Sequence, residues 1–272
     1  MSVTLALAQL QIEPADVETN LDRAADAVSL AADRGADLVV LPELFTVGFF
    51  AFDAYASSAC GLSGPIPERL RSIATEHDVG LIAGSFVEDL TESAADGHDT
   101  PASEGYANTV PCFDRDGVLS AVYRKRHLFG YDSEETALLT PGERHTVFEF
   151  GGLSIGVTVC YDLRFPKAYR ALVDRGATAV VVPSAWPYPR IEHWRTLARA
   201  RAVENLWYVA AANGVGQMRE GRLCGRSAVY DPWGTTVASL PDEPDLLVAE
   251  LDPDRVAAIR EEFPAIEDRR DE

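Results

Sequence analysis

Apolar strand-like runs alternate with amphipathic helix-like segments along the chain, and this alternation most constrains the fold. Residues 2–11, SVTLALAQLQ, form a β-strand pattern, and residues 14–35 form an amphipathic helical pattern that ends at Gly35. Residues 36–43, ADLVVLPE, follow as an almost wholly apolar run, which is typical of a strand covered on both faces. A strand, a helix and a buried strand in this order predict an α/β domain.

The second half of the chain repeats this alternation and adds hairpins. Residues 166–176 begin with proline and end with glycine, as helices often do, and residues 190–205 form a further helical pattern. Pairs of strand-like runs surround turn sequences at Asp116-Gly117, Gly151-Gly152 and Asp231-Pro232-Trp233-Gly234. The polar, acidic segment 89–105 is predicted to be an exposed hairpin loop. Because there is no linker, low-complexity tract or tandem repeat, we expect a single domain over residues 1–272.

The charge of the chain argues against several classes of partner. Its formal net charge is -19 at pH 7, which disfavours binding to nucleic acid or to an anionic lipid surface. The acidic residues are scattered, and the 24 basic residues are arginines except for Lys125 and Lys167. Many carboxylates with almost no lysine are typical of a protein adapted to concentrated salt, where a Debye length of about 3 Å at 1 M screens their repulsion.

Composition also bears on location and on metal binding. No run of about 18 apolar residues could span a membrane, and the first residues lack the basic start of a signal peptide. The four cysteines form no CxxC pair and have no spacing to histidine that suggests zinc. We therefore expect a cytoplasmic protein with free thiols, without a metal ion and without a membrane partner.

Cys160 stands at an unusual place, at the end of the β-branched run GVTVC. Polar residues follow it directly, in the sequence YDLR, before a helix begins near Pro166. Side chains at the carboxyl ends of strands often face a ligand, and the start of the following helix adds positive potential. A buried packing role is the alternative, because cysteine is commonly a core residue. As a nucleophile, Cys160 would need a base to take its proton.

Two kinds of base are open to this cysteine. His127 and His193 lie in sequence contexts that allow a cysteine–histidine pair, whereas His77 and His98 lie in predicted surface segments. Glu43 follows the buried run LVVLP, where burial would suit it to general-base catalysis. A solvated carboxylate at a strand end is the alternative interpretation of Glu43.

Lys125 follows another strand-like run, LSAVYR, in a chain that otherwise uses arginine. A lysine can take part in proton transfer and can hold a developing oxyanion, whereas arginine does not give up its proton. A solvated basic cluster is the alternative. A glutamate, a lysine and a cysteine at strand ends would together supply a base, an electrostatic stabiliser and a nucleophile.

Five segments together resemble the nitrilase superfamily of carbon–nitrogen hydrolases: LPELFTVGF, YRKRHLF, CYDLRFP, HWRTLARARAVEN and GRSAVYDPWG. The resemblance covers nearly the whole chain, and it is greatest to the amidase branch that includes ω-amidase and deaminated-glutathione amidase. It implies an α/β fold of the four-layer αββα sandwich type and a homodimer or larger homo-oligomer formed through helices. It also implies that neither a metal ion nor a cofactor is needed.

The same resemblance implies a role for each candidate residue. Glu43 in LPEL would be the general base, Lys125 in KRHL would stabilise the tetrahedral intermediate, and Cys160 in CYD would be the acylated nucleophile. Glu135 resembles the second glutamate of the family, which lies beside these three residues and positions them. The adjacent Glu134 is an alternative assignment for that second glutamate.

Two further residues bear on the substrate. The backbone N–H of Tyr161 would complete the oxyanion hole, and tyrosine in place of the tryptophan common in true nitrilases favours an amide over a nitrile. Arg164 matches the arginine that helps hold a substrate carboxylate in related carbamoylases, and a salt bridge to Asp162 or to a nearby glutamate is the alternative. The loop AWPYPRIEHW differs from the amidase branch, and we expect it to border the pocket.

The sequence therefore predicts an amidase. It would hydrolyse a small linear amide that carries a carboxylate at its far end to an acid and ammonia, through a thioester on Cys160. An N-carbamoyl amino acid amidohydrolase or a nitrilase with the same Glu-Lys-Cys triad is the main alternative. A Cys–His–Asp thiol hydrolase would instead need His127 or His193 beside the cysteine, and a non-enzymatic scaffold would have a broken triad.

Overall fold

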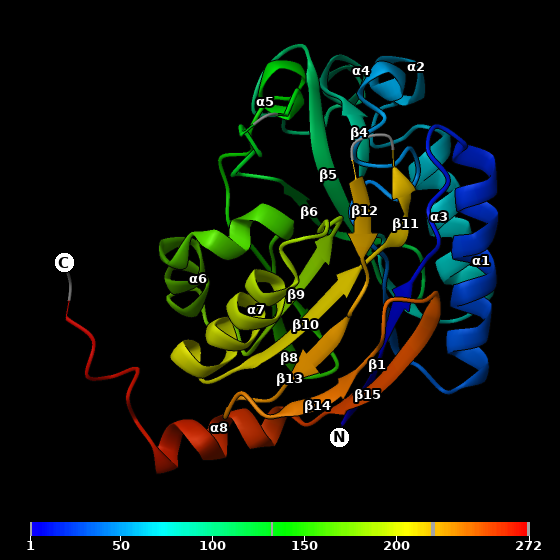
Figure 1. Cartoon of the computed structure of the whole chain (residues 1–272). Coiled ribbons are helices and arrows are strands. Elements are labelled where there is room, and N and C mark those ends of the chain that lie inside the picture. Colours follow the sequence, from blue (N-terminus) through cyan, green and yellow to red (C-terminus); the bar gives the residue numbers. More distant parts are fainter. Residues whose placement is uncertain (1, 132, 219–220, 271–272) are drawn as a thin grey trace.

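Two β-sheets lie face to face at the centre of the computed structural model, and helices cover the outer face of each sheet (Figure 1). Helices α1 (Val17–Asp33) and α3 (Pro65–Glu76) cover one side of the molecule. Helices α6 (Pro166–Val173) and α7 (Ile191–Asn205) cover the opposite side. The layers are therefore helix, sheet, sheet and helix, and the expected αββα sandwich is confirmed.

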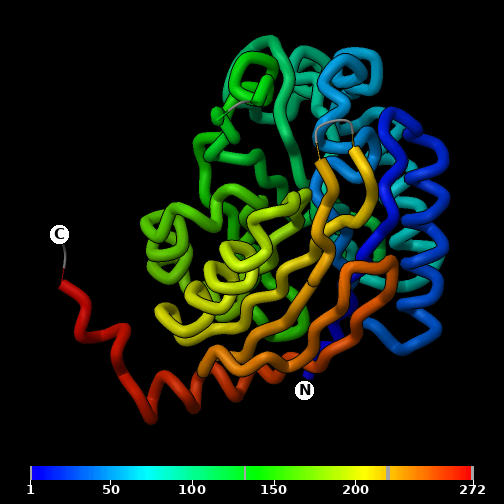
Figure 2. The backbone as a smooth tube through the Cα atoms, viewed as in Figure 1, coloured from blue at the N-terminus to red at the C-terminus, as the bar shows by residue number. Residues whose placement is uncertain are grey.

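The first sheet pairs the first strand with the last strand of the described chain, which comprises residues 2–131, 133–218 and 221–270. Its strand order is β15–β1–β2–β3–β5–β4, and β6 also pairs with β5. The pairs β1–β2 and β2–β3 are parallel, whereas β1 and β15 run antiparallel side by side (Figure 2). The strands are β1 (Val3–Gln9), β2 (Leu38–Val40), β3 (Gly80–Ile82), β4 (Phe86–Asp89), β5 (Tyr106–Phe113), β6 (Leu119–Arg124) and β15 (Asp245–Leu251).

The second sheet has the strand order β14–β13–β10–β9–β8–β7. Its central pairs β8–β9 and β9–β10 are parallel, and its outer pairs are antiparallel hairpins or crossovers. The strands are β7 (Thr146–Phe150), β8 (Leu153–Val157), β9 (Ala179–Ser184), β10 (Tyr208–Asn213), β13 (Ala228–Tyr230) and β14 (Thr236–Ser239). A separate two-stranded ribbon consists of β11 (Val215–Met218) and β12 (Gly221–Cys224).

Strand β1 illustrates how the sequence selects these layers. Its side chains point alternately to the two faces of the sheet. Leu5 and Leu7 are fully buried in the apolar cluster that includes Val157 of the second sheet. Ala6 and Ala8 are fully buried in the other apolar cluster, which includes residues of α1 and α3. The leucines therefore fill the space between the sheets, and the small alanines lie on the face that the helices cover.

The hairpins around the three predicted turns are present as β5–β6, β7–β8 and β13–β14. Helix α1 begins later than predicted because Asp16 caps it, with its side chain accepting a hydrogen bond from the Thr19 N–H. The remaining helical elements are η1 (Phe52–Ala54), α2 (Tyr55–Ser58), α4 (Leu90–Ala95), α5 (Glu135–Leu138), η2 (Cys160–Arg164) and α8 (Pro253–Glu262).

The segment 89–105 differs from its prediction as an exposed loop, because it contains α4. The Asp89 side chain caps this short helix by accepting hydrogen bonds from the N–H groups of Thr91 and Glu92. Leu90, the first residue of the helix, is fully buried. The segment still joins two antiparallel strands, β4 and β5.

Candidate active site

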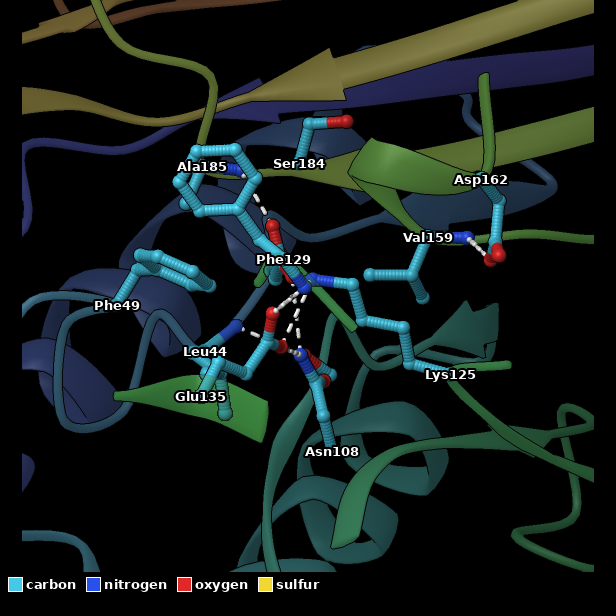
Figure 3. A network of polar contacts seen from close by, with 12 residues as sticks. Leu44, Phe49, Asn108, Lys125, Phe129, Glu135, Val159, Asp162, Ser184 and Ala185 are labelled. Atoms are coloured by element: carbon cyan, nitrogen blue, oxygen red, sulfur yellow. Dashed lines mark hydrogen bonds and ion pairs between the residues drawn. The ribbon is translucent and has the colours of Figure 1, made fainter. Parts of the chain in front are cut away.

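The three residues expected to react follow three different strands. Glu43 comes shortly after β2 and Lys125 comes directly after β6, and both strands belong to the first sheet. Cys160 comes shortly after β8 in the second sheet. The three side chains meet where the ends of these strands face one another, and Figure 3 shows the polar network around Lys125. The structure thus brings together residues that the sequence separates widely.

A buried lysine lies between two buried carboxylates. The Lys125 Nζ lies 2.8 Å from Glu43 Oε1. It also lies 2.8 Å from Glu135 Oε1 and 3.0 Å from Glu135 Oε2. All three side chains are shielded from solvent. Charges buried in this way are stable only when their other polar atoms also have partners, and the carboxylates here do have them.

Neighbouring N–H groups satisfy the two carboxylates (Figure 3). The Asn108 Nδ2 donates to Glu43 Oε1 at 2.9 Å and to Glu135 Oε1 at 3.3 Å. The Ala185 N–H donates to Glu43 Oε2 at 2.9 Å, and the Phe129 N–H donates to Glu135 Oε2 at 2.6 Å. Each carboxylate is therefore fixed by hydrogen bonds from more than one segment. We call Glu43, Asn108, Lys125 and Glu135 the lysine network.

The structure places Glu135, and not Glu134, in the lysine network. Glu135 is the first residue of α5 and is fully buried, whereas Glu134 is exposed to solvent. Successive residues on a helix point about 100° apart, so only one of two adjacent glutamates can face the lysine.

The charges in this network perturb one another. Burial alone would lower the pKa of Lys125, but Glu135 and Glu43 outweigh burial and hold that pKa above its ordinary value. Burial raises the pKa of Glu135 against the opposing effect of Lys125, and Glu43 adds to the rise. Lys125 is therefore a fixed cation at neutral pH, and a fixed cation can stabilise negative charge that develops beside it.

Cys160 begins the tight turn η2 in a strained backbone conformation. Its φ is 44°, in the left-handed region that residues other than glycine seldom adopt. The Asp162 side chain stabilises this turn, because its Oδ2 accepts hydrogen bonds from the Val159 N–H at 2.9 Å and from the Tyr123 hydroxyl at 2.6 Å. Leu44, directly after Glu43, also has a positive φ of 42°. Strained backbone of this kind clusters at functional sites.

The Cys160 side chain is a neutral thiol in this environment. Burial raises its pKa well above the ordinary value, Glu43 raises it further, and Lys125 partly opposes the rise. A hydrogen bond with Glu43 also contributes to the shift. Because the thiolate is the reactive form, a base must take the proton during the reaction. Glu43 is in position to do so.

The two histidines considered as bases have other contacts. The His127 Nδ1 lies 2.6 Å from Asp162 Oδ1, and the Asp162 Oδ1 also accepts a hydrogen bond from the His127 N–H at 3.1 Å. His193 lies on α7, where its Nδ1 lies 3.2 Å from the Nη2 of Arg164. Neither ring is among the groups that shift the pKa of Cys160 most. The geometry therefore favours Glu43 over a histidine as the base.

A narrow pocket, which we call the inner pocket, reaches Cys160 and Lys125 and encloses about 30 Å³. Aromatic side chains form much of its wall, together with two arginines: Phe49, Phe50, Phe129, Trp186, Arg164 and Arg190. The Phe49 ring centroid lies 5.1 Å from the Lys125 Nζ. A largely apolar pocket with a few convergent polar groups is typical of a site for a small molecule.

Arg164 lines the inner pocket, and its alternative role as a salt-bridge partner of Asp162 or a glutamate can be checked among the described residues. Among the described residues it forms no ion pair with Asp162 or with a glutamate, so that alternative is wrong. The reason is that Asp162 is engaged by Tyr123 and His127. The Arg164 guanidinium lies instead 5.0 Å from the Trp186 ring centroid and over Tyr161, and its Nη2 lies 3.2 Å from His193 Nδ1. The guanidinium thus has hydrogen bonds left for a ligand.

Two general features of the described residues complete the picture of the site. Residues 2–131, 133–218 and 221–270 contain no group of three or more His, Cys, Asp or Glu side chains that could hold a metal ion. In the same part of the chain, none of the helices combines the length and the apolar character needed to cross a bilayer. All four cysteines are buried and free.

Sequence reasoning missed Asn108 and most of the pocket wall. Asn108 lies inside β5, and asparagine is unfavourable in a strand interior, so its position was a signal that could have identified it. The phenylalanines of FTVGFFAF could equally have been core residues, and their spacing does not distinguish the two roles. The loop AWPYPRIEHW does border the pocket, as expected, through Ala185, Trp186, Pro187 and Arg190.

The chain is similar to known proteins of one family. The model of the family described as carbon-nitrogen hydrolase matches residues 4–261 of the chain. A 2-oxoglutaramate amidase from Paenarthrobacter nicotinovorans is 35% identical over 98% of this chain and 90% of its own length. The crystal structure of Saccharomyces cerevisiae Nit3, a member of branch 10 of the nitrilase superfamily, is similar with a TM-score of 0.85 and 31% identity, covering 97% of this chain and 94% of its own. An amidase from Nesterenkonia sp., solved with acrylamide added to its active site cysteine, is similar with a TM-score of 0.77 and 32% identity, covering 96% of this chain and 98% of its own.

Proposed function

The chain belongs to the carbon–nitrogen hydrolase family, and we propose that it is an amidase that releases ammonia from the ω-amide of a small dicarboxylic acid. One observation carries this proposal: the buried lysine network lies against a protonated Cys160 thiol at the end of a narrow pocket lined by arginine. The similarity to a 2-oxoglutaramate amidase supports the same class of substrate.

The first half of the proposed reaction forms a thioester. Glu43 takes the Sγ proton while Cys160 Sγ attacks the amide carbonyl carbon, and the carbonyl oxygen becomes an oxyanion. The Lys125 ammonium and the Tyr161 backbone N–H stabilise that oxyanion, and each such donor is typically worth about 3–4 kcal/mol. Glu43 then gives its proton to the amide nitrogen, the carbon–nitrogen bond breaks, and ammonia leaves.

The second half hydrolyses the thioester. Glu43 takes a proton from a water molecule as the water oxygen attacks the thioester carbonyl carbon. The same two donors stabilise the second tetrahedral intermediate. When that intermediate collapses, the carbon–sulfur bond breaks, the carboxylic acid leaves, and Glu43 returns its proton to Cys160 Sγ. The enzyme is then back in its starting protonation state.

Glu135 has a positioning role in this mechanism. It binds the Lys125 Nζ through both carboxylate oxygens and accepts a hydrogen bond from the Phe129 N–H. The ammonium therefore stays in one place while the neighbouring Glu43 gains and loses its proton. Fixed donors of this kind stabilise a transition state without reorganising during the reaction.

Arg164 is the proposed partner of the substrate carboxylate in the inner pocket. It lines that pocket, it has no carboxylate partner among the described residues, and a planar guanidinium binds a carboxylate through paired hydrogen bonds. An N-carbamoyl amino acid or a nitrile would react at the same triad, so both compounds belong in the substrate panel.

The acyl-enzyme is the most direct test of this function. Turnover of a slowly hydrolysed ω-amide, quenched in acid, should add the mass of the acyl group to the peptide that contains Cys160. Cys160→Ala should release no ammonia from any amide in the panel. Cys112→Ala is the matched control, because Cys112 is likewise a buried free cysteine and its thiol pKa is also raised by burial. Acyl mass on Cys60, Cys112 or Cys224 instead would contradict the proposal.

Assembly and location are part of the same proposal. We propose that residues 1–272 act as one domain and that two copies associate through helices of the α6–α7 layer. We also propose that the protein works in the cytoplasm, where its free cysteines stay reduced. Exposed apolar side chains next to α7 support the dimer: Val203 is 49% exposed, Trp233 43% and Phe263 51%. Light scattering should report twice the chain mass, and Val203→Glu should reduce it to that of one chain.

A further inference from the structure

The inner pocket is small, and its wall holds Cys160, Lys125 and Arg164. It encloses about 30 Å³. It suits a short substrate, whose carboxamide group lies against Cys160 and Lys125 while its carboxylate reaches Arg164. The remainder of a longer substrate must extend out of it.

A larger cavity, which we call the outer cavity, continues from the inner pocket. It encloses about 490 Å³ and shares Phe50, Phe129, Pro187 and Arg190 with the inner pocket. Its further lining includes aromatic side chains. Among the described residues that line the outer cavity, Arg190 is the only basic one. Arg164 lines the inner pocket but not the outer cavity. Arg190 therefore lies at the junction between the two spaces.

Hydrogen bonds fix the backbone around Arg190. The Arg190 carbonyl accepts a hydrogen bond from Trp186 Nε1 at 2.9 Å, and its N–H donates to the Pro187 carbonyl at 3.2 Å. Tyr188 ties the same loop to the body of the protein, because its hydroxyl donates to Asp242 Oδ2 at 2.6 Å. The loop that presents Arg190 is thus held in place.

The Arg190 guanidinium has an aromatic contact but no anionic partner. It lies 5.6 Å from the Phe129 ring centroid. Within residues 2–131, 133–218 and 221–270 no carboxylate forms an ion pair with it, although the exposed Glu134 lines the same cavity. In a chain with a net charge of -19, such a cation beside a cavity creates a local site for an anion.

We propose that Arg190 is a second carboxylate-binding residue, which selects ω-monoamides whose carboxylate lies far from the reacting amide. This inference rests on the proposed function. A carboxylate a short distance from the amide reaches Arg164 beside the inner pocket, and one farther along the chain reaches Arg190 at the start of the outer cavity. Succinamate represents the short substrate, glutaramate the intermediate one and adipamate the long one.

Chain-length profiles of two arginine variants test this assignment. In Arg190→Gln, kcat/KM should fall about tenfold to hundredfold for adipamate, mainly through KM, because a hydrogen bond to a charged group is lost. The same variant should keep kcat/KM within about threefold for succinamate and for the uncharged hexanamide. Arg164→Gln should show the reverse order. Arg195→Gln is the control, since it removes an exposed arginine of α7 that lines neither space and should change nothing.

Two outcomes would overturn the role of Arg190. Equal losses for adipamate and hexanamide would mean that Arg190 only supports Phe129 and the pocket wall. An unchanged profile would mean that the carboxylate binds elsewhere. Calorimetric binding of adipamate to Cys160→Ala, with and without Arg190→Gln, separates this inference from the proposed function. That assay needs no turnover, so weaker binding without Arg190 supports the inference even if ammonia release fails, and unchanged binding refutes it.

Discussion

Removing the charge of Lys125 should destabilise the protein as well as stop the reaction. In Lys125→Met, the buried carboxylates of Glu43 and Glu135 face one another without the cation that lies between them. Breaking a buried ion pair in this way costs about 3–5 kcal/mol, because the remaining charge is neither solvated nor paired. At about 2–4 °C for each kcal/mol, the midpoint of thermal unfolding should fall by about 6–20 °C.

The loss should depend on pH in a definite direction. Burial and Glu43 already raise the pKa of Glu135, and removing Lys125 removes the effect that opposes the rise. A carboxyl whose pKa is higher in the folded state than in the unfolded state binds more protons when folded. The free energy of unfolding of the variant should therefore increase as the pH falls from 8 toward the unfolded value of about 4.3, relative to the wild type.

Urea unfolding at several pH values measures this effect, and two companion variants interpret it. Lys125→Met with Glu135→Gln should be more stable at neutral pH than Lys125→Met alone, because one uncompensated charge is gone. Lys125→Arg keeps the cation, so most of the stability should remain, but most of the turnover should be lost because the shape and proton chemistry differ. A stability loss below about 1 kcal/mol, or one that does not vary with pH, would refute a buried, charged Lys125.

Three further perturbations follow from the site. Asp162→Asn should lower kcat about tenfold with little change in KM, because the turn that presents Cys160 loses a charged acceptor of the Val159 N–H. An unchanged kcat would show that the turn keeps its conformation without this charge. Arg164→Met should reduce kcat/KM for succinamate and spare butanamide, and an equal loss for both amides would mark Arg164 as structural. Transfer from molar to millimolar potassium chloride should lower the unfolding temperature, since a net charge of -19 is then less screened, and equal unfolding temperatures would exclude salt adaptation.

The residues that could be predicted from sequence share one property. Glu43, Lys125 and Cys160 each follow an apolar strand-like run, and a polar residue at the end of such a run faces the edge where ligands bind. The layers of the fold could be predicted because strand and helix patterns have different periods. The resemblance to a known family then placed the strands in two sheets.

Other features depend on geometry that a linear pattern does not contain. Glu134 and Glu135 are adjacent, and only the start of α5 decides which carboxylate reaches Lys125. Asn108 reaches both carboxylates from inside a strand, where spacing alone indicates packing. The junction at Arg190 depends on how much space the surrounding side chains leave, which is a property of packing in three dimensions.

The division of the site between two sheets has a consequence for the newly made protein. Glu43 and Lys125 extend from the first sheet, whereas Cys160 extends from the second, and the Ala185 N–H that holds Glu43 follows β9 of the second sheet. A growing chain therefore completes its proposed nucleophile and its proposed base on separate surfaces, and on this mechanism neither surface alone would hydrolyse an amide. Catalysis begins only when the sheets dock, so ammonia release reports on closure of the sandwich more sharply than helix or strand content does.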